Sequence, residues 1–389
     1  MKVQNKRDDH GLTERLDAVL DQFLAEKALV GTVLLVLRDG ELHYARAAGY
    51  ADREAGRRMR EDAIFRFASL TKPIVTAAVM RLIEQDRLGL NDPIDAYLPA
   101  FRPRLPDGTV PVITIHHLLT HTAGLAYGFL QPSDGPYPTA GISDGLDAPG
   151  RGFSDNLARI AEIPLAYPPG TKWGYSVALD VLGAALERLT GEALPDLVRR
   201  LVTAPLAMHD TDFVCRDPAR LAVAYGDAIP EPVRLGNTAV IPFGGASGIR
   251  VAPDRFADPG SFPSAGAGML GTAENFARFL ETIRTGGAPI LQRDSVAQMT
   301  RSQIGDLPVD LRDPGWGFGY GWSVLNDPVA ASAPHRAGTL QWGGVYGHSW
   351  FVDPALGLTV IGLTNTAVAG MTGRFPMAVR NAVYQAVIA

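Results

Sequence analysis

The strand-forming segments of this chain are divided between its two ends, and this division limits the folds that the chain can adopt. A β-branched run at residues 33–37 and an apolar segment at residues 42–47 flank the dipeptide Asp39-Gly40. Asp-Gly between two apolar runs favours a two-residue hairpin turn, so an antiparallel sheet is predicted to begin here. Three further strands are predicted near the other end, at residues 340–342, 349–352 and 358–364. One sheet is therefore expected to draw on both ends of the chain.

Helical patterns flank and separate these strand segments. Residues 13–27 and 376–388 carry apolar side chains at helical spacing, so each is predicted to form a helix. Four further helices are predicted in the middle of the chain, at residues 74–88, 114–121, 177–190 and 193–203. We expect a discontinuous α/β domain formed by residues 1–68 and 265–389, with a mainly helical domain at 69–264 inserted between them. A site in the cleft between the two domains is the expected arrangement.

The composition is typical of a folded protein and excludes several classes of function. Of the 389 residues, 46% are apolar and 20% are charged, and the formal charge of −5 is too small to indicate binding to nucleic acid or to an anionic membrane. Cys215 is the only cysteine, which excludes an intramolecular disulfide and a cysteine-built metal cluster. The apolar stretch at residues 28–37 is too short to cross a bilayer, and the first twelve residues lack the apolar region of a secretory signal. A cytoplasmic location is therefore expected.

The strongest catalytic candidates are Ser69 and Lys72, which precede Pro73 and an apolar run at residues 74–80. Proline is tolerated in the first turn of a helix, so Pro73 places Ser69 at a helix N-terminus, where backbone N–H groups can stabilise an oxyanion. The spacing of three brings Lys72 onto the same face as Ser69. Apolar surroundings disfavour a charged ammonium, so Lys72 is a candidate base for the serine, a role that arginine could not fill.

Two glycine-containing motifs compete with this candidate. A Gly-x-Ser-x-Gly sequence at residues 141–145 centres on Ser143, but a nucleophile elbow needs a strand before it and a helix after it, and both flanks are predicted to be loops. A Gly-x-Gly-x-x-Gly sequence at residues 266–271 lacks the preceding buried strand of a dinucleotide site. A tight turn followed by Thr272 as a helix N-cap explains the second motif without a cofactor.

His117 and His121 have the spacing of zinc-protease ligands. Leu118 nevertheless occupies the position of the catalytic glutamate in that motif, and no third ligand is evident. Structural roles are therefore favoured for both histidines, and no metal or cofactor is expected.

A serine–lysine mechanism also needs a proton carrier for the leaving group and a second oxyanion donor. Tyr175, just before the helix predicted at residues 177–190, is a candidate for the first role, with simple packing as the alternative. Residues 340–348 form a Gly-rich strand edge, where a backbone can approach a substrate closely.

The order of these motifs resembles that of the serine β-lactamase and penicillin-binding-protein superfamily. Its three motifs correspond here to Ser69-x-x-Lys72, Tyr175-Ser176-Val177 and Trp342-Gly343-Gly344. Three other segments are also similar to that superfamily, at residues 114–125, 266–276 and 316–321. Val177 and Trp342 stand where β-lactamases of the class C kind have an asparagine and a second lysine, which hold the amide and the carboxylate of their substrates. Without these anchors, the chain resembles a family VIII carboxylesterase with a β-lactamase-like fold from about Leu16 to Ala386.

The resemblance implies a role for each residue of the catalytic group. Ser69 would be the acylated nucleophile, Lys72 would deprotonate it, and Tyr175 would carry the proton to the departing alcohol. Lys72 and Tyr175 would titrate as a coupled pair, and either of them could be the base in the free enzyme.

The resemblance also implies the surroundings of the catalytic group. The backbone N–H groups of Ser69 and Val345 would form the oxyanion hole, and the substrate would contact Trp342, Gly344 and Tyr127. Trp342 would replace a cation with an apolar wall, which would leave Lys72 as the cation that poises the tyrosine. For His348, both contact with the substrate and a structural role stay open.

The leading hypothesis is a cofactor-free, metal-free serine carboxylesterase that hydrolyses short-chain, small-molecule esters through an acyl-enzyme. A β-lactamase or a D-alanyl-D-alanine carboxypeptidase is the alternative within the superfamily, and a non-catalytic binding protein on the same fold is the alternative outside it. Neither nucleic acid nor a membrane is an expected partner, and the sequence predicts no oligomeric state.

Overall fold

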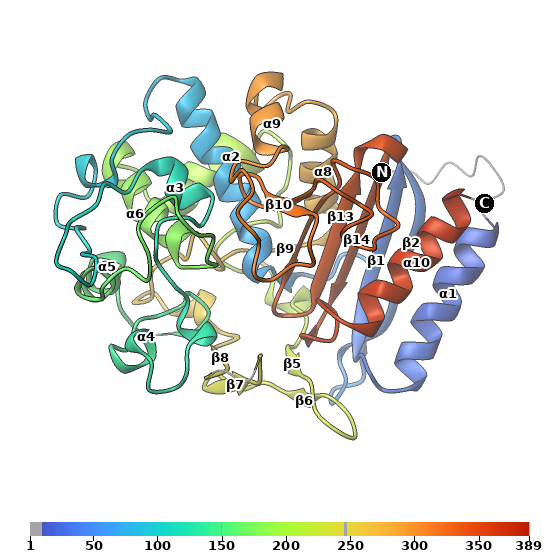
Figure 1. The fold of residues 1–389 in the computed structure, drawn as a ribbon. Coiled ribbons are helices and arrows are strands. Elements are labelled where there is room, and N and C mark those ends of the chain that lie inside the picture. Colours follow the sequence, from blue (N-terminus) through green and yellow to red (C-terminus); the bar gives the residue numbers. More distant parts are fainter. Residues whose placement is uncertain (1–9, 149, 245–246, 389) are drawn as a thin grey trace.

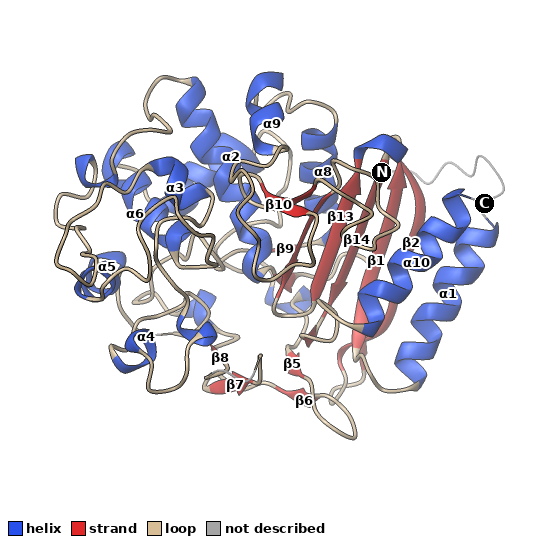
Figure 2. Cartoon of the chain, in the orientation of Figure 1, coloured by secondary structure: helices blue, strands red, loops and turns tan. Residues whose placement is uncertain are grey.

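The computed structural model describes residues 10–148, 150–244 and 247–388, and it places an antiparallel sheet beside a mainly helical region (Figures 1 and 2). The first nine residues of the polar start, which contributed to the expected cytoplasmic location, lie outside the described residues. Among the helices of the described ranges, none has both the length and the apolar character needed to cross a lipid bilayer.

The large sheet has eight strands in the order β10-β11-β12-β13-β14-β1-β2-β3, and every neighbouring pair is antiparallel. Its strands are β1 (Gly31–Arg38), β2 (Glu41–Asp52), β3 (Arg57–Arg58), β10 (Trp316–Phe318), β11 (Ser323–Leu325), β12 (Leu340–Gly344), β13 (His348–Asp353) and β14 (Leu358–Thr364). The predicted sheet with strands from both ends of the chain is confirmed. Asp39 and Gly40 form the predicted hairpin turn, with φ of +51° and +83°.

Helices cover both faces of this sheet. α1 (His10–Ala25) and α10 (Arg374–Ile388) pack against each other on one face, as Figure 1 shows, and they bury Leu34 and Val36 of β1. α8 (Ala273–Arg284) packs against β1 and β14. The predicted helix at 13–27 ends early because Lys27 takes a positive φ of 55°.

The other helices and turns connect or surround the large sheet, and the short strands form separate small sheets. The remaining helices are α2 (Thr71–Glu84), α3 (Ile115–Leu119), α4 (Pro136–Thr139), α5 (Phe153–Glu162), α6 (Ala178–Thr190), α7 (Leu194–Val198), a π-helical turn η4 (Arg199–Thr203) and α9 (Arg293–Met299). The 3₁₀ turns are η1 (Ala68–Leu70), η2 (Ile94–Ala96), η3 (Gly128–Leu130), η5 (Pro218–Arg220), η6 (Arg255–Ala257) and η7 (Pro354–Leu356). The short strands are β4 (Phe65–Arg66), β5 (Tyr225–Gly226), β6 (Val233–Arg234), β7 (Ala239–Ile241), β8 (Ile249–Val251), β9 (Leu270–Gly271) and β15 (Thr366–Ala367).

The middle of the chain differs from its predicted helices in detail. α2 starts three residues before the predicted 74 and ends at Glu84, because Asp86 takes a positive φ of 54°. α3 is shorter than the predicted 114–121, since the chain turns at His121 with φ +57°. The predicted division into two domains stays a proposal: β5 lies within residues 69–264, yet it pairs with β15 from the C-terminal part.

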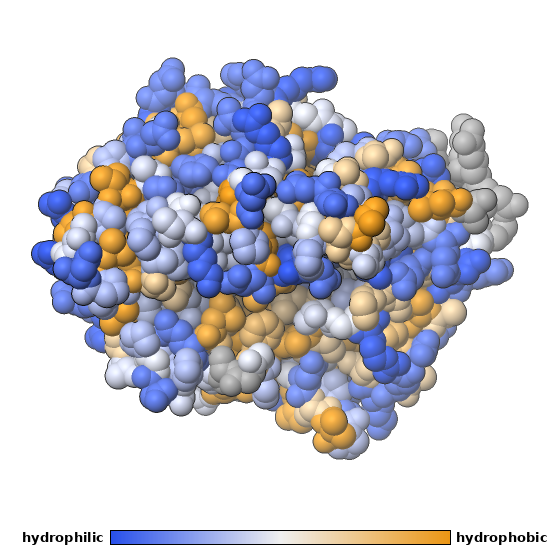
Figure 3. Space-filling model, viewed as in Figure 1, coloured by the Kyte–Doolittle hydropathy of each residue, from blue (hydrophilic) through white to orange (hydrophobic). Residues whose placement is uncertain are grey.

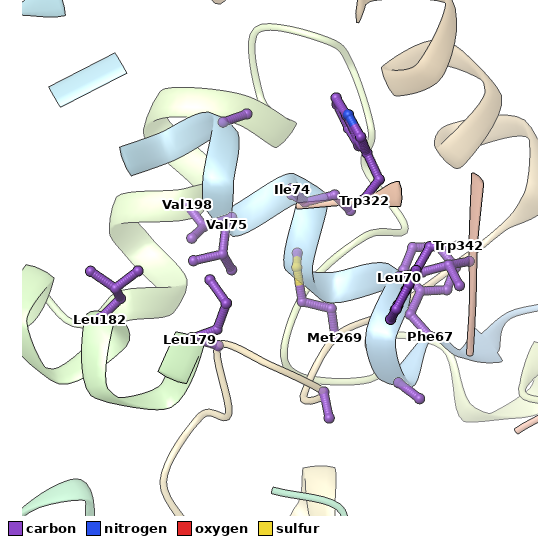
Figure 4. Packing of buried hydrophobic residues seen from close by; sticks show 14 of the residues in the cluster. Phe67, Leu70, Ile74, Val75, Leu179, Leu182, Val198, Met269, Trp322 and Trp342 are labelled. Atoms are coloured by element: carbon purple, nitrogen blue, oxygen red, sulfur yellow. The ribbon is translucent and has the colours of Figure 1, made fainter. Parts of the chain in front are cut away.

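Helix α2 lies at the centre of the main core, and its start is held firmly in place. Its residues from Thr71 to Met80 are buried on every side, as expected for a helix enclosed by a core. Figure 4 shows Val75 beside Leu179 of α6, and Trp342 of β12 beside Leu70 at the other end. The beginning of α2 is therefore fixed between the helical region and the sheet.

Candidate active site

Ser69 lies in a sharp turn between strand β4 and helix α2. The chain reverses at Ala68, whose φ of +46° is strained for a residue with a side chain, and Ser69 follows in the 3₁₀ turn η1. Its N–H group is in the first turn, where no intrahelical acceptor exists. The predicted position of Ser69 at a helix start is therefore confirmed, and its side chain is half-buried.

Lys72 occupies the next turn of the same helix segment and is 1% exposed. Its Nζ donates to Ser69 Oγ at 3.2 Å and to the carbonyl oxygen of Gly266 at 2.8 Å. The Nζ also lies 4.7 Å from the ring centre of Tyr175 and 5.2 Å from that of Tyr127. The ammonium is thus enclosed by aromatic faces and neutral oxygens, with the serine hydroxyl within reach.

Tyr175 reaches the same oxygen from the other side. Its Oη donates to Ser69 Oγ at 2.7 Å and accepts a hydrogen bond from Trp342 Nε1 at 3.2 Å. The structure therefore brings together Ser69, Lys72 and Tyr175, although Tyr175 lies 106 residues away in sequence.

The end of strand β12 lies directly against the Ser69 turn. A Cβ atom on Gly344 would lie 2.5 Å from the carbonyl oxygen of Phe67, so only glycine permits this approach. Val345 follows the last residue of the strand, and its carbonyl oxygen accepts from Val368 N at 3.0 Å. The two predicted oxyanion donors, the N–H groups of Ser69 and Val345, thus belong to segments in contact.

Trp342 is a buried residue of strand β12, and the guanidinium of Arg312 lies over its ring. The guanidinium carbon of Arg312 lies 5.1 Å from the ring centre of Trp342 and 5.0 Å from that of Trp316. Arg312 donates to neutral oxygens of Ser323 and Gln341, and burial lowers its pKa to about 10. The arginine therefore lies against the indole, and the expectation that Lys72 alone poises Tyr175 stays a prediction.

Aromatic rings complete the surroundings of the site. Tyr127 lies 4.9 Å from Tyr175, and it stacks on Phe129 at 4.6 Å. Phe243, from the segment between β7 and β8, meets Phe129 edge-on at 6.1 Å. On the face shown in Figure 3, apolar residues gather in a recess between the helical region and the sheet.

Sequence reasoning missed Asp180, the polar residue that supports Lys72 from behind. Asp180 is 1% exposed, and its Oδ1 accepts from Ser264 Oγ at 2.8 Å and from Gly266 N at 3.0 Å. Gly266 in turn accepts from Lys72 through its carbonyl oxygen. Burial raises the pKa of Asp180, and the two hydrogen bonds and the Lys72 charge oppose that effect. An aspartate within the apolar pattern of α6 was the available signal, but acidic residues are common in the first turn of any helix.

The histidines occupy structural positions. His117 Nδ1 accepts from Thr114 N in the capping box of α3, and His121 Nδ1 lies 3.1 Å from Ser176 Oγ. His348 is fully buried, its Nε2 lies 2.7 Å from the carbonyl oxygen of Arg66, and burial lowers its pKa to about 4. Within the described ranges, no group of three histidine, cysteine, aspartate or glutamate side chains is arranged to hold a metal.

Of the two competing motifs, the second reaches this arrangement through Gly266, whose carbonyl oxygen accepts from Lys72 Nζ at 2.8 Å. Ser143 is fully buried and donates to Asp147, and the short helix α4, where a loop was expected, precedes it in place of the strand of an elbow. Residues 264–267 form a turn, and Thr272 is the N-cap of α8, as predicted. A separate groove of about 1040 Å³ between α5 and α6 contains none of the predicted site residues.

Known proteins resemble this chain along nearly its whole length. Residues 16–380 match the family model described as Beta-lactamase. The chain is 52% identical to Esterase EstB of Burkholderia gladioli over 379 residues, which cover 97% of this chain and 96% of the relative. The solved structure of EstCE1, a hydrolase with promiscuous acyltransferase activity, matches with a TM-score of 0.92 and 44% identity, covering 97% of this chain and 99% of that one.

A more distant structure shows the fold alone. The penicillin-binding protein homologue from Pyrococcus abyssi matches with a TM-score of 0.75 at 21% identity, covering 95% of this chain and 76% of that one. Together these matches confirm the predicted β-lactamase-like fold and the resemblance inferred from the motifs.

Proposed function

The chain belongs to the beta-lactamase family, and on that basis we propose that it is a serine carboxylesterase that hydrolyses short-chain esters through an acyl-enzyme on Ser69. The observation that carries the proposal is that Ser69 Oγ accepts hydrogen bonds from both Lys72 Nζ, at 3.2 Å, and Tyr175 Oη, at 2.7 Å. A serine hydroxyl is a weak nucleophile until an adjacent base removes its proton, and this geometry offers two such bases.

The acylation step uses these groups in order. Lys72 or Tyr175, in its deprotonated form, takes the proton of Ser69 while Oγ bonds to the ester carbonyl carbon. The N–H groups of Ser69 and Val345 stabilise the negative charge that develops on the carbonyl oxygen. The carbon–oxygen bond to the alcohol then breaks, and Tyr175 gives the proton to the departing alkoxide.

Hydrolysis of the acyl-enzyme runs through the same groups in reverse. A water molecule loses a proton to the Lys72–Tyr175 pair and attacks the acyl carbon. The bond from that carbon to Ser69 Oγ breaks, and the proton returns to the serine. The carboxylic acid leaves, and the starting hydrogen bonds to Ser69 form again.

The polar groups near the site favour esters over β-lactams. Val177 is fully buried and offers no hydrogen bond to a substrate amide, and the indole N–H of Trp342 is already donated to Tyr175. A site without partners for an amide and a carboxylate discriminates against substrates that bring both. We therefore expect a higher kcat/KM on a p-nitrophenyl ester than on a penicillin, and the reverse order would assign β-lactam cleavage to the site.

Paired serine substitutions test the proposed nucleophile. Ser69→Ala should lower kcat on a p-nitrophenyl ester by at least ~10³, the scale seen when a nucleophile is removed. Ser143→Ala should leave turnover near that of the unmodified protein, because Ser143 is buried and donates to Asp147. An active-site phosphonate should label the unmodified protein and Ser143→Ala, but not Ser69→Ala. Loss of activity in Ser143→Ala alone would move the site, and absence of labelling throughout would favour a non-catalytic binding protein.

The substrate in this proposal is a small-molecule ester. The cytoplasmic location expected from the sequence stays a prediction.

A further inference from the structure

The 3₁₀ turn η3 and the residue before it carry two stacked aromatic rings beside Tyr175, an aromatic wall of the proposed site. Tyr127 is the N-cap of this turn and Phe129 is its middle residue, and their rings stack at 4.6 Å. Tyr127 lies 4.9 Å from the ring of Tyr175 and 5.2 Å from Lys72 Nζ, and Phe129 lies 6.5 Å from the ring of Tyr175. A shift of this turn would move the apolar surface beside the reacting groups.

A buried carboxylate holds the turn at its backbone. Asp144 is 8% exposed, and its two oxygens accept separate hydrogen bonds, Oδ1 from Gly128 N at 2.7 Å and Oδ2 from Phe129 N at 3.0 Å. Two hydrogen bonds to one carboxyl group fix its orientation as well as its position, although burial raises the pKa of Asp144 to about 7. A Cβ atom on Gly128 would lie 3.1 Å from Asp144 Oδ2, so the turn approaches the carboxylate closely.

Asp144 belongs to the Gly-x-Ser-x-Gly motif that the proposed reaction leaves unused, and the rest of that motif holds it in place. Ser143 N donates to Asn156 Oδ1 at 2.9 Å, and Asn156 Nδ2 donates back to the carbonyl oxygen of Ser143 at 3.1 Å. Ser143 Oγ donates to Asp147 and accepts from Gly145 N at 3.2 Å. The two backbone hydrogen bonds to Asn156, which do not involve the serine hydroxyl, therefore anchor the segment that presents the aspartate.

Gly145, the last residue of the motif, also lies against Ser264 and Asp180, which lie behind Lys72. Gly145 has φ +81°, and a Cβ atom there would lie 2.2 Å from Ser264 Oγ and 3.1 Å from Asp180 Oδ2. Asp180 accepts from Ser264 Oγ and from Gly266 N, and the carbonyl oxygen of Gly266 accepts from Lys72. The motif thus contacts the turn that carries Tyr127 and Phe129 through Asp144. Through Gly145 it also contacts Ser264 and Asp180, which lie behind Lys72.

We propose that Asp144 is a positioning residue that sets the selectivity of the site for the apolar part of its ester, by holding the turn that carries Tyr127 and Phe129. This inference rests on the proposed esterase function and adds a specificity determinant to it. Without the carboxylate, two buried N–H groups lose their acceptors, and the turn has to move to find others. The rings of Tyr127 and Phe129 then no longer pack against a long acyl chain. The binding of a short acyl group depends less on these rings.

Asp144→Asn tests the proposal with little change of shape. The asparagine oxygen can accept from one N–H group, but its amide would face the other. For p-nitrophenyl hexanoate relative to p-nitrophenyl acetate, the ratio of kcat/KM should fall about tenfold through a raised KM for the hexanoate, which is the scale on which an apolar pocket distinguishes methylene groups. Gly128→Ala should change the ratio in the same direction, because its added Cβ atom pushes the turn away from the intact carboxylate of Asp144. If Asp144→Asn does not fold, Gly128→Ala decides the question.

Asp353→Asn is the matched control. Asp353 is also a fully buried carboxylate that accepts two backbone N–H bonds, from Arg336 at 3.1 Å and Leu356 at 3.3 Å, but it lies at the end of strand β13. This control should lower the melting temperature and leave the selectivity ratio unchanged. An equal change of the ratio in Asp353→Asn would show a general effect of stability and would overturn the proposal.

Crystal structures separate this inference from the proposed function. If the unmodified protein cleaves no ester, the esterase proposal fails, and the position of residues 127–130 in Asp144→Asn still decides whether the carboxylate holds the turn. A displaced turn supports the role of Asp144. An unmoved turn, or an unchanged selectivity ratio in an active enzyme, would overturn it.

Discussion

At the scale of single residues, Trp342 connects a buried cation to the proposed proton carrier. One face of its ring lies over Arg312, and its Nε1 donates to Tyr175 Oη at 3.2 Å. Tyr175 in turn donates to Ser69 Oγ. The indole therefore helps to hold the tyrosine at hydrogen-bonding distance from the nucleophile, in addition to forming a wall.

Trp342→Phe should lower kcat about five- to tenfold with a smaller change in KM. The phenyl ring keeps most of the packing, but the hydrogen bond to Tyr175 is lost, and one such bond contributes about 1 kcal/mol. Steady-state kinetics on p-nitrophenyl acetate measure the effect. A variant with unchanged kcat would show that the indole N–H has no part in placing Tyr175.

Trp173→Phe is the control for the loss of an indole. Trp173 is fully buried, its ring is parallel to that of Tyr175 at 6.2 Å, and its Nε1 has no hydrogen-bond partner among the described residues. The substitution removes the same atoms without breaking a hydrogen bond, so it should lower kcat less than Trp342→Phe does.

Local chemistry made the first members of the site predictable. The spacing of Ser69 and Lys72, together with Pro73 in the first turn, depends only on helix geometry. Asp144, Asp180 and Arg312 could not be predicted in the same way, because each acts on residues outside its own helix or turn. Nothing in the neighbouring residues distinguishes a buried carboxylate or guanidinium of this kind from a solvated one.

At the scale of elements, the contact between strand β12 and the Ser69 turn positions the proposed oxyanion hole. The strand ends at Gly344, next to the carbonyl oxygen of Phe67, and Val345 follows immediately. The two N–H donors therefore depend on how closely a sheet edge approaches a helix start.

Gly344→Ala should lower kcat/KM by about 10²- to 10³-fold, the scale of losing one oxyanion donor. The added Cβ would lie 2.5 Å from a backbone oxygen, so the strand end and the turn have to separate. Kinetics and a thermal melt measured on the same samples would show a loss of activity much larger than the loss of stability predicts.

Gly362→Ala is the control in the same sheet. A Cβ atom on Gly362 of β14 would lie 3.5 Å from Ser349 Oγ, which is ordinary contact. Activity should stay within about twofold of that of the unmodified protein. If both alanine variants lose activity equally, general distortion of the sheet would explain the result, and the contact at Gly344 would have no special role.

Long, strongly patterned elements were predictable, and short ones were not. The hairpin of β1 and β2, the strands β13 and β14 and the helix α10 follow from apolar periodicity. β10 and β11 have three residues each, too few to establish a period of two, and they become strands through pairing, β10 with β11 and β11 with β12. α5 was missed because its apolar positions are sparse, with Leu157 and Ile160 among its few buried side chains.

At the scale of the whole molecule, a buried hydrogen-bonded network ties the C-terminal helix to the sheet. Tyr384 of α10 donates to Asp353 Oδ2 at 2.5 Å at the end of β13, and its Oη lies 2.9 Å from His335 Nδ1. His335 is 3% exposed and meets the rings of Phe351 and Tyr384 edge-on. Burial, together with the charges of two arginines, lowers the pKa of His335 to about 3.

This network should make the protein less stable in acid, and His335→Gln should reduce the effect. Folded His335 stays neutral down to about pH 3, whereas an unfolded histidine binds a proton below about pH 6.5. The unfolded state therefore holds the extra proton between these values, so the free energy of unfolding falls as the pH is lowered from 6.5 towards 3. Between pH 6.5 and 4.5 the loss from this residue alone should be about 2 kcal/mol.

Urea unfolding at pH 6.5 and 4.5 measures this difference directly. Glutamine keeps a hydrogen bond to Tyr384 within reach but does not titrate, so the change in unfolding free energy between the two pH values should shrink by about 2 kcal/mol in His335→Gln. Ester hydrolysis at pH 7 should be unaffected, because His335 packs on α10, away from Ser69. An equal acid loss in both proteins would mean that other groups cause it, with the fully buried His348, whose pKa is lowered to about 4, as the next residue to replace.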